Sequence, residues 1–411
     1  MKKFAYLPLF LCLSATAAVE NPVIYGEDDR IDLRDASEMQ KNLARGTAVM
    51  VPKERIKKRL FSRSASFSGV STFNDQVLDY EGIPLCKEER FREEVTAGVC
   101  SGFLIAPDIM VTAGHCIMTE RQCKSHDWVF DFALDDKGKY SIEKKNIYSC
   151  EKLIAWKNDF ISGLDYAIIK LNKRVKDRKP LDIRRMGKID DNAEVMVIGN
   201  PYGLNTKVSA GATVVDNEDE TFFVSDLDTL QGNSGSAIFN AKTGVVEGIL
   251  VRGEEDFDYD YENECFKSKR CENASECRGE DVIRITELPE IRSGGKLHMI
   301  AEEGSANEIT SELKTTRWID ATNEQGASPL MTAAKNNNLE VMDLLLSLGA
   351  DINHQDISGN TALHVLAAMG QSSSEAFQKL LQNGAKLSIK NVRGQTAKAI
   401  LKSVNSGNNH R

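Results

Sequence analysis

The sequence predicts a multi-domain chain in which an all-β domain is followed by an all-α repeat solenoid. Between residues 95 and 252, short runs of β-branched and apolar residues alternate with turn signals, a spacing typical of a sandwich or barrel. After about residue 290 the sequence becomes rich in Ala and Leu and repeats itself. A chain of 411 residues is long enough for two or three domains, each with its own core.

The N-terminus has the pattern of a cleaved export signal. Lys2 and Lys3 precede an apolar run over residues 4–13, and small residues follow at 15–17. We therefore expect residues 1–18 to be a signal peptide and the mature protein to be secreted or periplasmic. The apolar run is too short for a membrane anchor, and no later segment is apolar enough to span a bilayer.

Composition and net charge limit the kinds of molecule that this protein is expected to bind. The chain is 41% hydrophobic and 27% charged, which is ordinary for a soluble globular protein. Loss of Lys2 and Lys3 with the signal moves the formal net charge from −9 to −11. This acidity argues against a general nucleic-acid binder but leaves cationic substrates open. We expect no cofactor and no metal.

The cysteines indicate disulfides. One of the nine leaves with the signal, and an even set in an exported chain is typical of disulfide pairing. A zinc site is the alternative, but the closely spaced group at 265, 271 and 277 lacks CxxC spacing and a nearby histidine. The eight that remain are Cys86, Cys100, Cys116, Cys123, Cys150, Cys265, Cys271 and Cys277.

The β-rich part starts before residue 95. Residues 23–33 and 46–52 have strand-forming sequences, whereas 53–63 is a basic run followed by Ser-, Phe- and Gly-rich sequence. The region 53–90 is either a processing site or a surface insertion, and the sequence does not decide between them. Within "SAIFNAKTGVVEGILV" we expect a hairpin that turns around residues 241–244.

The C-terminal part, residues 293–411, consists of related units. Gly326, Gly359 and Gly394 lie 33 and 35 residues apart, and each begins a Gly-x-[ST]-[PA]-L-like pattern with two helical segments. This period and pattern resemble the ankyrin repeat, a fold without chemistry of its own that presents a protein-binding surface. The resemblance implies a protein partner that the sequence does not identify. The units are 295–325, 326–358, 359–393 and a partial cap at 394–404.

Three motifs in the β-rich part carry residues suited to acyl transfer by serine. They are "VTAGHC" at 111–116, "LDYAIIKL" at 164–171 and "QGNSGSAIF" at 231–239. The motifs and their order resemble those of the trypsin-like (chymotrypsin-fold) serine peptidases, which implies a double β-barrel over residues 19–292. By this resemblance His115 is the general base, Asp165 orients and stabilises it, and Ser234 is the nucleophile.

The same resemblance implies how the site is supported. The backbone N–H groups of Gly232 and Ser234 would form the oxyanion hole, the pair of donors that binds the charged oxygen of the tetrahedral intermediate. Cys100 and Cys116 occupy the places of a family disulfide that holds the histidine turn. A Cys123–Cys150 pair is a further guess.

The branch of the family is indicated by Asn233, which precedes the nucleophile where trypsins have an aspartate. An amide cannot form the ion pair that activates trypsins. "GNSGS" and "VIYGEDDR" at 23–30 resemble the V8-like (glutamyl endopeptidase) bacterial branch. We therefore expect residues 19–52 to belong to the peptidase domain, and any zymogen control to differ from that of trypsin.

Substrate choice depends on the S1 pocket, which binds P1, the residue before the scissile bond. Leu250 stands where glutamyl endopeptidases carry a histidine, which argues against cleavage after Glu. Asp228 lies six residues before Ser234, where trypsins hold the carboxylate that binds Lys or Arg, and Thr229 lies beside it. The seven carboxylates of 254–264 are consistent with basic substrates. The alternatives are that Asp228 caps a turn or is neutralised by Arg252, and that the acidic loop is a solvated face or a weak Ca²⁺ site.

The sequence thus predicts an exported serine endopeptidase that hydrolyses protein or peptide substrates, after Lys or Arg, with ankyrin repeats that recruit or gate substrates. The alternative from another class is an inactive peptidase fold that serves as a protein-binding module. An esterase with the same triad is chemically possible, but the strand–elbow–helix context of lipases is missing.

Overall fold

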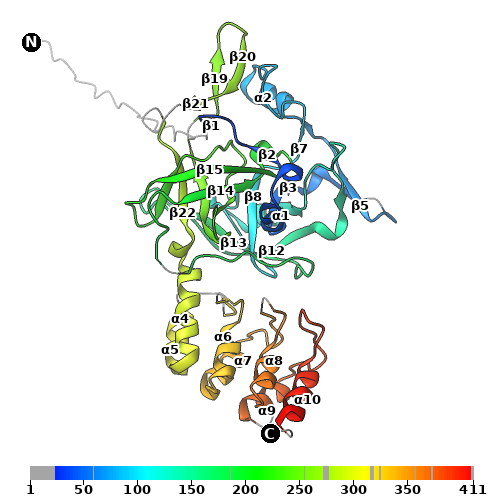
Figure 1. Cartoon of the computed structure of the whole chain (residues 1–411), viewed down its shortest axis with the longest axis vertical. Helices are drawn as coiled ribbons and strands as arrows, with labels where there is room; N and C mark the ends of the chain where they lie inside the picture. Colours follow the sequence, from blue (N-terminus) through cyan, green and yellow to red (C-terminus); the bar gives the residue numbers. More distant parts are fainter. Residues whose placement is uncertain are drawn as a thin grey trace, which may run out of the picture.

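The computed structural model describes residues 24–58, 60–185, 187–253, 255–271, 277–314, 319–323, 325–356, 358–371 and 374–408. The expected signal peptide lies outside these ranges. In the described part, the chain forms two six-stranded β-barrels followed by a stack of helix pairs (Figure 1). This confirms the double barrel and the helical solenoid.

The first barrel is closed and antiparallel, with the strand order β10-β12-β13-β9-β8-β3. Its centre is filled by Trp128, which contacts the strand β8 at Gly102, where a Cβ atom would lie 2.6 Å from the indole ring. Because β3 belongs to this barrel, residues 47–52 are part of the folded core. The strands are β3 (Thr47–Pro52), β8 (Cys100–Ala106), β9 (Ile109–Thr112), β10 (His126–Phe130), β12 (Ile147–Asn158) and β13 (Asp165–Leu171).

The second barrel has the order β14-β17-β18-β22-β16-β15 and closes through the pairing of β14 with β15. The hairpin expected around 241–244 joins β17 to β18, and Gly244 has the positive φ of +71° that its turn requires. The short strand β2 (Ile31–Asp32) extends the sheet beyond β15. The barrel strands are β14 (Glu194–Gly199), β15 (Lys207–Asp216), β16 (Phe222–Ser225), β17 (Ala237–Asn240), β18 (Val246–Arg252) and β22 (Glu280–Arg284).

The remaining strands form small sheets outside the barrels. The basic run at 53–63 falls in a three-stranded sheet and its β4–β5 hairpin, which projects from the first barrel (Figure 1). The acidic loop is also a hairpin, β19–β20, and Asp260 accepts the backbone N–H groups of its own turn. These strands are β1 (Ile24–Tyr25), β4 (Ile56–Lys58), β5 (Ser64–Phe67), β6 (Ser71–Thr72), β7 (Val95–Thr96), β11 (Ile142–Glu143), β19 (Phe257–Asp260), β20 (Cys265–Ser268) and β21 (Arg270–Cys271).

Disulfides join parts of the β-barrel domain that are distant in the sequence. The described cysteines pair as Cys86–Cys265, Cys100–Cys116, Cys123–Cys150 and Cys271–Cys277. The expected pairs at 100–116 and 123–150 are both present. The group at 265, 271 and 277 is used in disulfides rather than as zinc ligands. The first of these bridges ties the turn end of the acidic hairpin to the segment after the helix α2 (Phe73–Glu81).

The helices lie mostly in the C-terminal part. The three full repeats each contribute a helix pair, and Ser328 and Ser374 cap the starts of two of these helices. The first repeat helix begins at Pro289, directly after the second barrel. The helices are α1 (Glu38–Ala44), α2 (Phe73–Glu81), α3 (Glu120–Ser125), α4 (Pro289–Glu303), α5 (Ala306–Glu312), α6 (Pro329–Lys335), α7 (Leu339–Ser347), α8 (Ala362–Ala368), α9 (Glu375–Gln382) and α10 (Ala397–Asn408).

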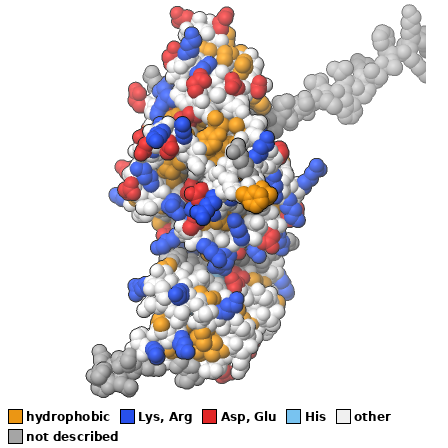
Figure 2. Space-filling model, turned by 90° about the vertical axis from the view of Figure 1, so that its right-hand side faces the viewer, with side chains coloured by type: hydrophobic (Ala, Val, Ile, Leu, Met, Phe, Trp, Pro, Cys, Tyr) orange, Lys and Arg blue, Asp and Glu red, His pale blue; other side chains and the backbone are white. Residues whose placement is uncertain are grey.

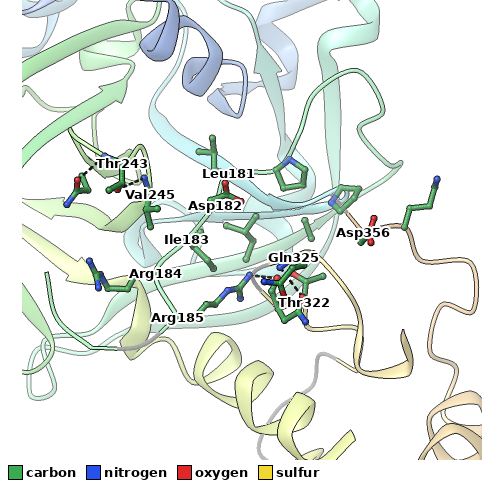
Figure 3. Close-up of a pocket in the computed structure, with 18 of the residues that line it drawn as sticks. Leu181, Asp182, Ile183, Arg184, Arg185, Thr243, Val245, Thr322, Gln325 and Asp356 are labelled. Carbon is green, nitrogen blue, oxygen red and sulfur yellow. Dashed lines mark hydrogen bonds between the residues drawn. The ribbon is translucent and has the colours of Figure 1, made fainter. Parts of the chain in front are cut away.

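The polar turns between repeats face the β-barrel domain. Asp351 forms an ion pair with Arg174 at 3.0 Å, and the Asn323 carbonyl accepts a hydrogen bond from Arg185 at 3.2 Å. Figure 3 shows the cavity of about 700 Å³ at this junction, lined by peptidase residues such as Leu181 and Ile183 and by repeat residues such as Thr322. The repeats are therefore docked on the β-barrel domain through the ends of their hairpin turns.

On the face shown in Figure 2, acidic and basic side chains are interspersed and hydrophobic side chains form only small patches. The distribution is that of an ordinary solvated surface. Among the described residues, no helix has the length and apolar character needed to cross a membrane.

Candidate active site

His115 lies in a short 3₁₀ turn, Gly114–Cys116, that directly follows β9. Its Nδ1 atom is 2.7 Å from Asp165 Oδ2, and its backbone N–H donates to Asp165 Oδ1 at 2.9 Å. The carboxylate therefore fixes both the ring and the backbone of the histidine. Asp165 is buried, whereas about a third of the His115 side chain is exposed. The ring nitrogen that does not face Asp165 is left for a substrate or nucleophile.

The histidine turn approaches β12 and β13 closely because Gly114 has no side chain. A Cβ atom there would overlap the Lys157 carbonyl oxygen and would lie 2.8 Å from Asp165 Oδ1. Trp156 reinforces this contact, since its indole N–H donates to the Gly114 carbonyl at 2.7 Å. The Cys100–Cys116 disulfide holds the other side of the turn.

Ser234 lies in the turn between β16 and β17, which is anchored to the first barrel by Ser101. The Ser101 N–H donates to the Ser234 carbonyl at 2.9 Å, and the Ser101 hydroxyl donates to the Gly232 carbonyl at 2.9 Å. Cys116 Sγ is 3.7 Å from the same Ser234 carbonyl, which places the Ser234 turn beside the histidine turn. Among the described residues, the Ser234 hydroxyl has no hydrogen-bond partner. A hydrogen bond between a serine hydroxyl and its base commonly forms only when substrate is bound.

The backbone around Ser234 leaves two donors available. Gly232 and Gly235 have φ values of +90° and +87°, which favour glycine. The N–H groups of Asn233, Gly235 and Ser236 are bonded to carbonyls, but within the described part of the chain the N–H groups of Gly232 and Ser234 have no acceptor. Two unused donors next to the nucleophile are the arrangement that an oxyanion hole requires.

The peptide before Gly232 is held by two residues that the sequence motifs did not include. Tyr202 donates its N–H to the Gln231 carbonyl, and both carboxylate oxygens of Asp256 accept the Gln231 N–H at 3.2 Å. Asp256 is fully buried next to the Tyr202 side chain, and burial raises its pKa to about 8. Asp256 belongs to the acidic sequence 254–264 but points inward, so this acid is not part of a solvated face.

Replacing Asp256 with Asn should make folding stability less dependent on pH. The raised pKa means that the folded protein keeps a proton that the unfolded chain loses above pH 4, so the free energy of unfolding falls as the pH rises from about 4 to about 8. An Asn side chain does not titrate and escapes this loss, which amounts to at most about 1.4 kcal/mol per pH unit. We expect the melting temperature of the variant to rise by several degrees relative to the wild type between pH 5 and pH 8.

Thermal unfolding at pH 5, 6.5, 8 and 9 measures this difference. Asp260→Asn, which changes an acid with a lowered pKa in the same hairpin, is the matched control and should show no such gain at high pH. Wild-type and Asp256→Asn curves that stay parallel over this range would contradict the assignment.

The three residues predicted for the S1 pocket, Asp228, Thr229 and Leu250, differ from one another in their surroundings. Both oxygens of Asp228 accept backbone N–H groups of the N-terminal segment, from Tyr25 at 2.6 Å and Asp29 at 2.9 Å. This is the turn-capping arrangement considered as an alternative above. Burial raises the pKa of Asp228 to about 7, and the nearby Asp29 carboxylate adds to this effect. Arg252 does not neutralise Asp228, because it pairs with Asp281 at 3.2 Å.

Leu250 and Thr229, the other two residues predicted for the S1 pocket, do not share the contacts of Asp228. The Leu250 side chain is buried in the core of the second barrel, while its backbone bonds to the nucleophile turn through Gly235 and Ser236. The Thr229 hydroxyl donates to the carboxylate of Glu280 at 2.8 Å. Glu280 is a buried acid next to the predicted S1 segment, and no motif in the sequence identified it.

Cys100, His115 and Cys116 also place potential metal ligands within 4.8 Å of one another. The two sulfur atoms are joined in a disulfide, however, so neither is a thiolate that could bind a metal.

The candidate catalytic residues and the repeats lie at opposite ends of the first barrel. The strand β13 begins at Asp165 and ends at Leu171, which bonds to the Asp108 carbonyl; three residues later Arg174 pairs with Asp351 of the repeats. A strand of this length spans about 20 Å. The repeats therefore contact the barrels away from His115, and Figure 1 shows their helices below the barrels.

Comparison with known proteins agrees with the double barrel and the helical repeats. Residues 100–249 match a family model described as a trypsin-like peptidase domain, and residues 297–391 match a model of ankyrin repeats in three copies. The chain is 35% identical over 75 residues to the mouse inactive serine/threonine-protein kinase TEX14, and 37% identical over 75 residues to the mouse B-cell lymphoma 3 protein homolog. Each match covers 18% of this chain, and 5% and 17% of the respective relative. A third relative, mouse NF-kappa-B inhibitor delta, is 36% identical over 77 residues, which are 18% of this chain and 24% of that protein.

Proposed function

We propose that this chain, which carries a trypsin-like peptidase domain followed by ankyrin repeats, is an exported serine endopeptidase. The observation that supports the proposal most directly is the double hydrogen bond between Asp165 and His115, next to a nucleophile turn with two unused N–H donors. Together these supply the base, the acid that orients it, and the oxyanion donors that acyl transfer by serine needs.

In the proposed reaction Ser234 attacks the carbonyl carbon of the scissile peptide bond, and His115 takes the hydroxyl proton through Nε2. Asp165 keeps Nδ1 protonated and stabilises the imidazolium that forms. The N–H groups of Gly232 and Ser234 bind the oxyanion. His115 then gives its proton to the leaving amine, and water hydrolyses the acyl-enzyme by the same steps.

The repeats are proposed to recruit protein substrates rather than to cap the site. Ankyrin repeats act by binding proteins, and here they are docked about one strand length from the catalytic residues. A protein held by the exposed helical surface would be kept near the open active site, which raises its effective concentration there. The expectation of cleavage after Lys or Arg belongs to the same proposal.

Labelling with a fluorophosphonate probe tests the proposed activity, because the probe reacts with a serine only when its base and oxyanion donors are in place. The wild-type protein, expressed with its export signal, should be labelled once, at Ser234. Ser234→Ala should not be labelled, although its thermal stability should be close to that of the wild type.

Ser236→Ala is the matched control, since Ser236 lies two residues away and is buried. The Ser236→Ala variant should still be labelled at Ser234. A folded wild-type protein that does not react would favour the alternative, in which an inactive peptidase fold serves as a protein-binding module.

A further inference from the structure

We infer that the tip of the β4–β5 hairpin docks the protein on a membrane surface that contains anionic lipids. Such docking goes beyond the proposed peptidase activity and does not depend on it. Three observations carry it: two exposed apolar side chains at the tip, Leu60 and Phe61, the conformation of the chain there, and the cations beside them.

The hairpin has a buried base and an exposed tip. At the base, Ile56 and Ala65 pack against the core cluster that contains Phe67, and β5 pairs with β11. At the tip, Leu60 is 81% exposed and Phe61 is fully exposed, and neither belongs to a core cluster of the described residues. Single exposed apolar residues are ordinary, but here two large ones are adjacent at the end of a projecting hairpin.

The tip does not have the sequence of an ordinary turn. Turn positions with a positive φ are normally taken by Gly, Asn or Asp, which adopt this conformation at little cost. Phe61 has a φ of +66°, so a bulky residue is held in a strained conformation although its side chain is not packed. Strain without a gain in packing indicates that the exposed side chain has a function.

Cations lie beside the tip. Residues 53–63 contain six Lys or Arg and one Glu, a net charge of +5 in a chain whose formal net charge is −9. Lys57 in β4 and Arg63 directly before β5 are both exposed. Lys58 is bound to the buried Asp127 at 3.0 Å, but within the described part of the chain no acid pairs with Lys57 or Arg63. These two cations are therefore available to an anionic surface.

A lipid surface suits this tip better than a protein partner. A stable protein interface buries about 800 Å² on each side, far more than two side chains at a hairpin tip offer. At a bilayer, apolar side chains reach about 5–10 Å into the boundary between headgroups and acyl chains, while cations beside them contact anionic headgroups. The hairpin is the outermost part of the described chain on the right-hand side of Figure 1, so a flat surface reaches the tip without meeting the barrels.

Co-sedimentation of the full chain with lipid vesicles tests the docking. The wild-type protein, expressed with its export signal, should bind vesicles of phosphatidylcholine and phosphatidylglycerol more tightly than vesicles of phosphatidylcholine alone, and added salt should weaken this binding. Replacing both apolar residues, Leu60→Ser with Phe61→Ser, should weaken binding by about tenfold or more. Reversing both charges, Lys57→Glu with Arg63→Glu, should weaken it to a similar extent.

Phe160→Ser with Ile161→Ser is the matched control. These two side chains are also adjacent and largely exposed, at 79% and 99%, but they lie in the loop between β12 and β13. Asp159 precedes them, and no basic run surrounds them. This double variant should bind the anionic vesicles as tightly as the wild type does.

Phe61→Trp reports whether the tip enters the lipid, because an indole ring is well suited to the membrane interface. Relative to the wild type, its fluorescence should shift to the blue when the anionic vesicles are added. It should also be quenched by lipids that carry bromine on their acyl chains.

A wild type that does not bind the anionic vesicles would overturn the inference in favour of a protein partner. Unchanged binding after both tip residues are replaced would also overturn it, and so would a Phe61→Trp variant without a blue shift. Fluorophosphonate labelling of Ser234 should be the same in all hairpin variants. A protein that binds the vesicles but is not labelled would instead overturn the proposed peptidase activity and leave the docking intact.

Discussion

Asp165→Asn should lower kcat by about 10⁴-fold while leaving KM for a peptide substrate within about threefold of the wild type. The amide can still occupy the space of the carboxylate, but it cannot accept hydrogen bonds from His115 at both Nδ1–H and the backbone N–H while also stabilising an imidazolium. One of these contacts, at 2.7 and 2.9 Å, must be lost or reversed. The histidine then holds the wrong tautomer for accepting the Ser234 proton.

The measurement is steady-state hydrolysis of the best P1 substrate, with thermal unfolding of the same samples. Asp127→Asn provides a matched control, because Asp127 is also a buried acid of the first barrel, bonded to Ser149 at 2.6 Å and to Lys58 at 3.0 Å. The Asp127→Asn variant should be less stable than the wild type, but its kcat should stay within about threefold of the wild-type value. An Asp165→Asn variant that retained more than a tenth of the wild-type kcat would show that Asp165 does not serve His115 in catalysis.

Much of the fold could be predicted from short segments of the sequence because the relevant signals are local. The hairpin between β17 and β18, the repeat helices and each of the three motifs depend on residues close together in the chain. The long strand β12 was not identified, because its charged residues interrupt the alternation that marks a strand. The role of the N-terminal segment depended on the resemblance to a family rather than on its own pattern.

The supporting residues of the site could not be predicted, because each acts through a contact that is distant in sequence. Ser101 is 131 residues from its partner Gly232, Trp156 is 42 residues from Gly114, and Glu280 is 51 residues from Thr229. An isolated Ser, Trp or Glu in a strand gives no signal of such a contact. Only the fold shows that these side chains converge on the turns that carry His115 and Ser234.

Gly232→Ala should lower kcat by about 10²- to 10³-fold, the range found when one oxyanion donor is removed. Gly232 has a φ of +90°, and a Cβ atom there would lie 2.7 Å from the Tyr202 nitrogen and 3.1 Å from both the Asn200 carbonyl and the Gly203 nitrogen. Tyr202 and Gly203 form the turn that holds Gln231, so they cannot move away without displacing the same peptide. The backbone at residue 232 must therefore rotate, and its N–H turns away from the oxyanion.

The readout is kcat for an amide substrate, together with the affinity for a peptide aldehyde, whose tetrahedral adduct carries the oxyanion. Both should fall, whereas noncovalent binding of a product peptide should change by less than about threefold. Gly244→Ala is the matched control: Gly244 also has a positive φ, of +71°, but lies in the β17–β18 turn against Leu43. It should show a similar backbone strain of about 1 kcal/mol without loss of kcat. If Gly232→Ala bound the aldehyde as tightly as the wild type, the two free N–H groups would have to serve another purpose than binding the oxyanion.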